Sequence, residues 1–105
     1  MVKEIKYADF EKEVINCNVP VMIDFYATWC GPCMMLSPLV DKISENYDGK
    51  VKFLKVNVDE EEELAIQFKV SSIPLLVLIK DNKVINQSLG YIDENKLNAF
   101  INSAL

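Results

Sequence analysis

The sequence predicts an α/β fold built on one mixed sheet, and three observations support this prediction. Segments with strand and helix patterns alternate along the chain in the order βαβαβαββα. The helices between the earlier strands favour parallel pairing, whereas the last two strands are joined by a tight turn and must be antiparallel. Half of the 105 residues are apolar, which suffices for a core without disulfide staples. We therefore expect a single domain over residues 1–105, with a central five-stranded sheet flanked by four helices.

The first half of the chain contains two expected strands and two expected helices. A short strand over residues 2–6 precedes a helix over residues 8–16. Residues 21–26 form a nearly continuous apolar run, which is typical of a central strand buried on both faces. The next helix extends over residues 32–48, contains Pro38 as an expected kink and is followed by Gly49, which suits its C-terminal cap. Its inward positions are Leu36, Leu39, Val40, Ile43 and Tyr47.

A third strand and a third helix follow. Residues 51–58 alternate well enough for a strand. Asp59 and Glu62 are spaced like a capping box, which predicts the start of a helix over residues 60–68. The apolar positions of this helix are Leu64, Ile66 and Phe68.

The chain ends in a hairpin and a helix. Two strands, over residues 75–79 and 84–89, are joined by the tight turn of residues 80–83. The last helix begins near Asp93. Its buried positions are Leu97, Phe100 and Ile101.

Composition and charge argue against several classes of function. The formal net charge is −5, and all 11 basic residues are Lys, so no basic stripe is present to bind nucleic acid. The absence of His removes the usual general base and the commonest metal ligand. No apolar run approaches the ~18 residues that span a bilayer, and residues 1–6 show no signal-peptide pattern. Three cysteines form no even disulfide framework, which indicates a reducing compartment, the cytoplasm.

The pentapeptide Trp29-Cys30-Gly31-Pro32-Cys33 carries the chemistry, because two cysteines at this spacing can alternate between a disulfide and a dithiol. Cys30, at the expected start of a helix, is favoured as a thiolate and is the candidate nucleophile. Cys33, one turn further on, would resolve the mixed disulfide. Pro32 suits the first helical position, and Trp29 is interpreted as a wall beside the reactive sulfur, with an ordinary core residue as the alternative. Half of a zinc site is disfavoured because no full set of four ligands is present.

This motif, placed after a buried strand, resembles the thioredoxin family, and the expected fold is similar over essentially the whole chain. The Gly31-Pro32 dipeptide is the one found in the reducing members of the family. The resemblance implies a protein-disulfide reductase in which Cys30 attacks a substrate disulfide and Cys33 releases the reduced protein. It also implies re-reduction by a thioredoxin reductase, no bound cofactor and no metal. We expect a monomer whose partners are that reductase and disulfide-containing proteins.

Asp24 is the second informative position, because a carboxylate in a buried apolar strand must be functional or well paired. The resemblance makes it the buried aspartate that takes the proton from Cys33, through water or directly. Lys55, on the adjoining strand, matches the lysine that accompanies this aspartate in many members. An ordinary surface lysine is the alternative for Lys55.

The loop before the fourth strand is expected to bind substrate. Ile73-Pro74 resembles the family's cis-proline loop, which implies a cis peptide bond and an Ile73 backbone free to pair with an extended substrate segment. Gly90 matches a glycine that lets substrate backbone approach closely. Tyr91 would place an aromatic ring beside this groove.

Several positions depart from the family pattern. Tyr26 replaces a common Trp, Leu75 stands where Thr is common, and Met34 stands where a cation often follows the second cysteine. Tyr91 occupies a position where a small residue is frequent. These changes affect partner choice and redox poise rather than the exchange reaction. Cys17 has no partner suggested by spacing and is interpreted as a small buried hydrophobe, with a regulatory thiol as the alternative.

Two rival functions remain at this point. A disulfide oxidase or isomerase would use the same atoms in the other direction, and a measured reduction potential separates it from a reductase. A non-catalytic scaffold would bind its partner independently of Cys30 and Cys33. The intact set of expected catalytic residues favours the reductase.

Overall fold

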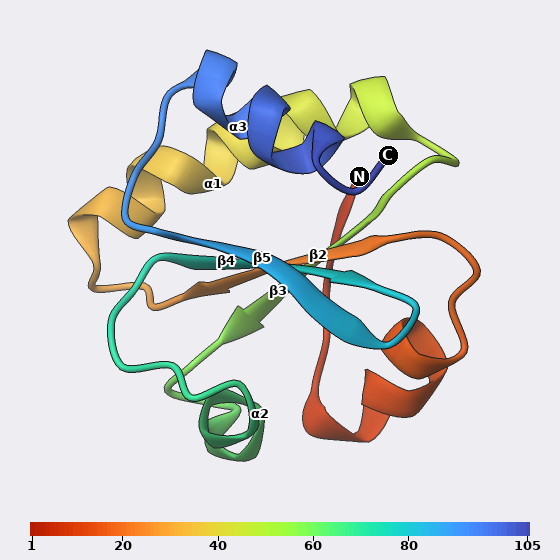
Figure 1. Ribbon diagram of the computed structural model, residues 1–105. Helices are drawn as coiled ribbons and strands as arrows, with labels where there is room; N and C mark the ends of the chain where they lie inside the picture. Colours follow the sequence, from red (N-terminus) through yellow and green to blue (C-terminus); the bar gives the residue numbers. More distant parts are fainter.

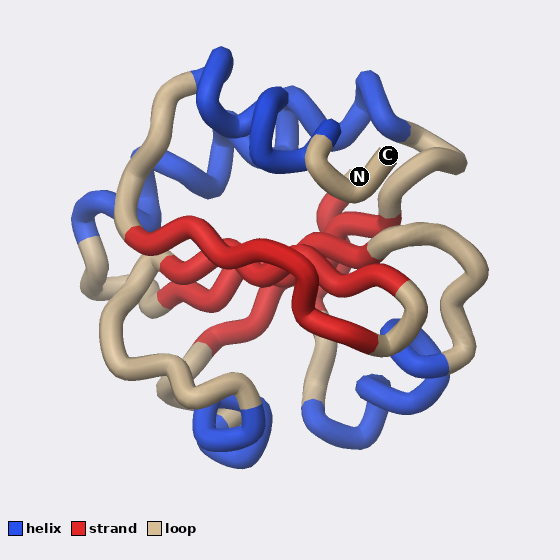
Figure 2. The backbone as a smooth tube through the Cα atoms, viewed as in Figure 1, coloured by secondary structure: helices blue, strands red, loops and turns tan.

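A five-stranded sheet runs through the middle of the computed structural model, which describes residues 1–105 (Figure 1, Figure 2). Its spatial order is β1 (Val2–Glu4), β3 (Lys52–Asn57), β2 (Val21–Tyr26), β4 (Leu75–Lys80) and β5 (Lys83–Leu89). The first three of these strands pair in parallel, whereas β4 runs antiparallel to both β2 and β5. The predicted mixed sheet is therefore confirmed.

Helices cover both faces of the sheet. Figure 1 shows α1 (Gly31–Ser44) and α3 (Glu94–Asn102) on one face, and α2 (Glu62–Gln67) with the segment after β1 on the other. Each face buries its own apolar cluster. β2 contributes to both clusters, with Met22 on the α1 side and Ile23 on the α2 side, because alternate residues of a strand point to opposite faces. All six residues of β2 are buried, as the apolar run predicted.

The expected strand over residues 2–6 and the helix over residues 8–16 are both altered. β1 ends at Glu4, and a 3₁₀ turn at Tyr7–Asp9 leads into a π-helical turn at Glu11–Ile15. The backbone N–H of Lys6 donates to Asp9 Oδ2 (3.0 Å), which starts the turn. The bond from Asn16 N to Glu11 O (3.0 Å) spans five residues and defines the π geometry.

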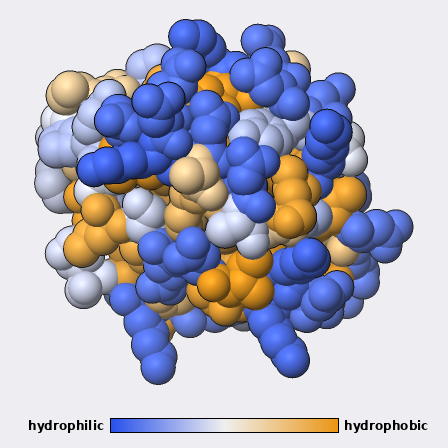
Figure 3. Space-filling model, turned by 45° about the horizontal axis from the view of Figure 1, so that its top comes forward, coloured by the Kyte–Doolittle hydropathy of each residue, from blue (hydrophilic) through white to orange (hydrophobic).

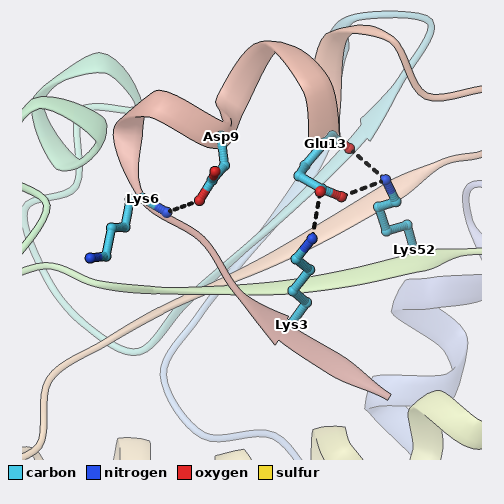
Figure 4. Close-up of polar contacts among 5 residues, drawn as sticks. All are labelled: Lys3, Lys6, Asp9, Glu13 and Lys52. Atoms are coloured by element: carbon cyan, nitrogen blue, oxygen red, sulfur yellow. Dashed lines mark hydrogen bonds and ion pairs between the residues drawn. The ribbon is translucent and has the colours of Figure 1, made fainter.

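Glu13, within this π-helical turn, is buried although it is charged. Its Oε2 accepts from Lys3 Nζ on β1 (2.6 Å), and its Oε1 accepts from Lys52 Nζ on β3 (2.9 Å) (Figure 4). Lys52 Nζ also donates to the Glu13 carbonyl oxygen (3.1 Å). The two ammonium groups lower the pKa of Glu13 to about 2, mainly through these hydrogen bonds. Glu13 therefore links the irregular segment to two strands of the sheet.

The long helix α1 is shorter than the sequence suggests. It ends at Ser44, and a 3₁₀ turn at Glu45–Tyr47 follows, with Pro38 retained inside the helix. Gly49 has φ +79°, a conformation that glycine adopts at little cost, and it reverses the chain toward β3. The helix begins at Gly31, so Pro32 occupies the second helical position rather than the first.

The expected capping box at the start of α2 is wrong. The helix begins at Glu62 with Glu61 as its N-cap residue and no side-chain cap. Before it lies a turn in which Asn57 accepts from the N–H groups of residues 59–61, and Asp59 Oδ2 accepts from Trp29 Nε1. Of the three expected apolar positions only Leu64 is fully buried, whereas Phe68 is half-buried and Ile66 is exposed. With only six residues, α2 is too short to bury a continuous apolar stripe.

The C-terminal hairpin and helix agree with the sequence. The turn between β4 and β5 consists of Asp81 and Asn82, both at positive φ (53° and 63°), as a two-residue hairpin turn requires. Asp93 caps α3 by accepting from Lys96 N (2.9 Å). No helix in the structure is long and apolar enough to cross a membrane. A space-filling view shows apolar surface divided into patches between hydrophilic side chains (Figure 3).

Candidate active site

Cys30 and Cys33 lie at the junction between β2 and α1 and form a disulfide, with a Cα–Cα distance of 5.2 Å. Cys30 is the N-cap residue of α1, and its Sγ accepts a hydrogen bond from Cys33 N (3.3 Å). This sulfur therefore lies where unpaired helix N–H groups favour negative charge. Cys33 is fully buried, whereas Cys30 retains 6% exposure. The expected contrast between an outer and an inner sulfur is present in the geometry.

Trp29 is a surface residue, so its alternative interpretation as an ordinary core residue is wrong. It is 72% exposed, yet its Nε1 donates to Asp59 Oδ2 at 2.7 Å. Trp29 follows the end of β2 and Asp59 follows the end of the neighbouring parallel strand β3. The hydrogen bond fixes an exposed indole next to the reactive sulfur.

The Ile73-Pro74 loop and Gly90 meet beside the disulfide. The Ile73–Pro74 peptide bond is cis, as expected from the family resemblance, and the Ile73 carbonyl oxygen lies 3.9 Å from Cys30 Sγ. Gly90 has φ +88°, and its N–H donates to the Pro74 carbonyl oxygen (2.8 Å). Tyr91, the next residue, is 45% exposed. Ile73 and Gly90 are half-buried, and Pro74 between them in this contact is buried.

Asp24 is only 2% exposed, and its Oδ1 is buried without a hydrogen-bond partner. Burial raises the pKa of Asp24 to about 7 by disfavouring the charged form, and the positive charge of Lys55 opposes this rise. A carboxylate that titrates near neutral pH is suited to exchange a proton with a thiol.

Lys55 is the direct neighbour of Asp24 across the parallel pair of β2 and β3. The two side chains nevertheless form no ion pair within 4.0 Å. The Lys55 ammonium lies 5.9 Å from the centroid of the Tyr26 ring instead. Lys55 therefore influences Asp24 through space rather than by direct contact.

A cavity of about 330 Å³ lies between the sheet and α1, and Asp24 and Lys55 line it from the sheet side. Ser37 and Asp41 line it from α1. The cavity is polar and large enough for water, which could bridge the unpartnered carboxylate oxygen to solvent.

The fold and this site define a class of protein, the thiol–disulfide oxidoreductases, in which a helix-capping cysteine and a buried partner cysteine exchange disulfides. The thioredoxin family model matches residues 1–103. The chain belongs to the thioredoxin family.

Three similar proteins from distantly related organisms are each named thioredoxin. The chain is 44% identical over 101 residues to thioredoxin of Haemophilus influenzae, covering 96% of this chain and 94% of that protein. It is 38% identical over 105 residues to thioredoxin of Rickettsia felis, covering both chains completely. The identity to thioredoxin of Pyropia yezoensis is 39% over 101 residues, covering 96% of this chain and 94% of that one.

Family membership and the disulfide geometry together establish the chemistry. The protein is a protein-disulfide reductase that acts by dithiol–disulfide exchange through Cys30 and Cys33, and a thioredoxin reductase restores its dithiol. The sequence alone did not identify Asp59, Ser37 or Glu4 as parts of this region. Asp59 could have been found, because residues following neighbouring parallel strands emerge at the same sheet edge.

Proposed function

We propose that Cys30 is the attacking sulfur of the reductase. Its thiolate attacks one sulfur of a substrate disulfide, a bond forms between Cys30 and that sulfur, and the other substrate sulfur leaves as a thiolate. The observation that supports this assignment is the position of Cys30 Sγ at the N-cap of α1, where it accepts from Cys33 N. Negative charge on this sulfur is favoured there, and Cys33 lies one turn deeper.

Cys33 then resolves the mixed disulfide. Its thiol loses a proton to the Asp24 carboxylate, the resulting thiolate attacks Cys30 Sγ, and the second substrate sulfur leaves as a thiolate. The unpartnered Oδ1 of Asp24 and its pKa of about 7 support the role of proton acceptor. Lys55, across the strand pair, keeps that pKa from rising further.

The substrate binds along the surface next to Cys30. An extended substrate segment pairs with the backbone of Ile73, whose conformation is set by Pro74, and Gly90 leaves room for its close approach. Trp29, next to Cys30 in the chain, and Tyr91, next to Gly90, supply exposed aromatic surface for this contact. Gly31 and Pro32 form the first turn of α1 and hold the two cysteines at disulfide spacing.

Residues 1–105 act as one domain and, in our proposal, as a cytoplasmic monomer that binds thioredoxin reductase and disulfide-containing proteins in turn. Two apolar clusters packed on the two faces of one sheet support the single domain. An equilibrium sedimentation mass near 12.0 kDa would support the monomer, and twice that mass would contradict it.

The decisive test is trapping of mixed disulfides from a cell extract. Cys33→Ser should accumulate stable adducts through Cys30, because the resolving sulfur is missing. Cys30→Ser should accumulate none, and Cys17→Ser is the matched control that should behave as the unaltered protein. Equal trapping by Cys30→Ser and Cys33→Ser would reject this division of roles.

A second test uses the fully reduced protein near neutral pH. Iodoacetamide should modify Cys30 much faster than Cys33 or Cys17, because only Cys30 caps the helix. Mass mapping gives the order directly. If Cys33 were alkylated first, the roles of the two sulfurs would be reversed.

A further inference from the structure

Tyr26 packs against the two cysteines and lies on the same strand as the buried Asp24. It ends β2, two residues after Asp24, so both side chains lie on the face covered by α1. Tyr26 is 8% exposed and packs in one cluster with Ala27, Cys30 and Cys33. The hydroxyl of Tyr26 is therefore buried next to the cysteines, and a buried hydroxyl requires a hydrogen-bond partner.

The hydroxyl and the ring of Tyr26 engage opposite charges. The hydroxyl donates to Glu4 Oε2 on β1 at 2.7 Å, and the Lys55 ammonium on β3 lies 5.9 Å from the ring centroid. Glu4, Lys55 and Asp24 are register neighbours across β1, β3 and β2. Lys55 therefore stands between two carboxylates, one near the surface and one buried.

Few other charged groups lie around the row formed by Glu4, Lys55 and Asp24. Lys55 faces Glu4 from β1 and Asp24 from β2, while Asp41 lines the same cavity from α1. Glu60, after β3, acts on Tyr26 from the outer side. Burial and the neighbouring carboxylates raise the pKa of Tyr26, so its hydroxyl remains a hydrogen-bond donor over the working range of pH. The hydrogen bond stabilises the Glu4 carboxylate at the Tyr26 hydroxyl and occupies one of its oxygens, which limits its pairing with Lys55.

We propose that Tyr26 is a positioning residue for the exchange reaction: its hydroxyl binds Glu4 and its ring supports Lys55, so that the ammonium stays where its charge acts on Asp24. The inference rests on the proposed role of Asp24 as the proton acceptor of Cys33. Loss of the hydroxyl frees Glu4 to draw Lys55 away from Asp24. Loss of the Glu4 carboxylate leaves Asp24 as the principal anion beside Lys55.

The test measures the titration midpoint of Asp24 in the oxidised protein, by ¹³C NMR of its labelled carboxyl carbon. Tyr26→Phe keeps the ring and should raise this midpoint by about half a pH unit, the effect of moving the ammonium a few ångströms away. Glu4→Gln should lower it by a similar amount. In the double variant the midpoint should follow Glu4→Gln, because the hydroxyl then has no carboxylate to hold. The pH profile of disulfide release should move with the midpoint.

Tyr47→Phe is the matched control, since it removes another buried tyrosine hydroxyl, bonded to Asn98 Oδ1 at 2.8 Å and separate from the cavity. It should lower stability without moving the Asp24 midpoint. An unchanged or lowered midpoint in Tyr26→Phe, or an equal shift in Tyr47→Phe, would overturn the proposal. The carboxyl titration does not depend on turnover, so it distinguishes failure of this inference from failure of the proposed role of Asp24. If only the role of Asp24 failed, the Asp24 midpoint would shift in Tyr26→Phe while the rate of disulfide release would stay the same.

Discussion

Two residues in the region of the active site contradict the usual distribution of their types: Asp24 is buried and Trp29, next to Cys30 in the chain, is exposed. The first keeps an unpartnered oxygen in a region of low dielectric, and the second leaves a large aromatic surface in contact with water. In our proposal both arrangements serve disulfide exchange, with Asp24 as the proton acceptor for Cys33 and Trp29 as exposed contact surface next to Cys30.

The bond between Trp29 and Asp59 gives a prediction at the scale of a residue. Asp59→Ala should free the indole, lowering the steady-state fluorescence anisotropy of this single tryptophan. Reduction of protein disulfides should slow by up to about fivefold. The exposed charge-assisted hydrogen bond that orients the indole is worth roughly 1 kcal/mol, and this stabilisation is lost. Glu60→Ala, which removes the next carboxylate, should change neither property. Unchanged anisotropy in Asp59→Ala would show that the bond does not hold the ring.

The residues of the site were predictable to the extent that their signal is local. The cysteine pair is visible in five consecutive residues, and Asp24 is conspicuous within an apolar run. The hydrogen bond of Trp29 was not predictable from a local pattern, because it depends on which strands become neighbours. The place of Lys55 beside Asp24 was expected only from the family resemblance. Lys55 lies beside Asp24 only because β3 occupies the position between β1 and β2.

At the scale of elements, the four long strands and α3 follow their sequence patterns, α1 is shorter at its C-terminal end, and the two short helical segments depart most. The segment after β1 is a 3₁₀ turn followed by a π-helical turn, and within it Glu13 binds two lysines of the sheet. The one signal of this irregularity in the sequence was a charged residue, Glu13, on the inward face of the expected helix over residues 8–16. α2 starts late because the chain first makes a turn in which Asn57 accepts hydrogen bonds from residues 59–61, a turn that no pattern within residues 60–68 can show.

The end of α2 supplies the element-scale prediction. Lys69 follows the C-cap residue Phe68 and itself has φ 56°. Two backbone hydrogen bonds close the turn, from Lys69 N to Ile66 O (3.0 Å) and from Val70 N to Ala65 O (2.9 Å). Glycine is the preferred residue in this left-handed position. Lys69→Gly should therefore stabilise the protein by about 0.5–1 kcal/mol in urea unfolding.

Lys96→Gly is the comparison for that substitution, because Lys96 is an exposed residue inside α3. It should destabilise the protein by about 1 kcal/mol through the poor helix propensity of glycine. Opposite signs for the two substitutions would confirm that the backbone conformation decides the effect. Loss of stability in both would show that the Lys69 side chain matters more than its φ angle.

For the whole molecule, two buried carboxyl groups have opposite effects on stability. The pKa of Asp24 is raised from 3.8 to about 7, so its ionisation penalises the folded state increasingly between these values and levels off above pH 7. The pKa of Glu13 is lowered from 4.5 to about 2, so its stabilisation is complete above pH 4.5 and is lost as the pH falls toward 2. Together they place the maximum stability of the oxidised protein near pH 4 to 5.

Urea unfolding of the oxidised protein from pH 2 to pH 8 tests this balance, with one variant for each side of the curve. Asp24→Asn should remove most of the decline in stability above pH 5. Its free energy of unfolding should gain up to roughly 4 kcal/mol relative to the unaltered protein between pH 4 and pH 8, at about 1.4 kcal/mol per pH unit.

Glu13→Gln should lower stability at pH 7 by roughly 1 to 2 kcal/mol, a modest amount because the paired ammonium groups remain partly in water. Its deficit should disappear toward pH 2, where Glu13 of the unaltered protein also becomes protonated. A stability difference for Asp24→Asn that is the same at pH 4 and pH 8 would show that Asp24 does not titrate in this range. If its rate of disulfide release were also unchanged, Asp24 would have no part in the mechanism.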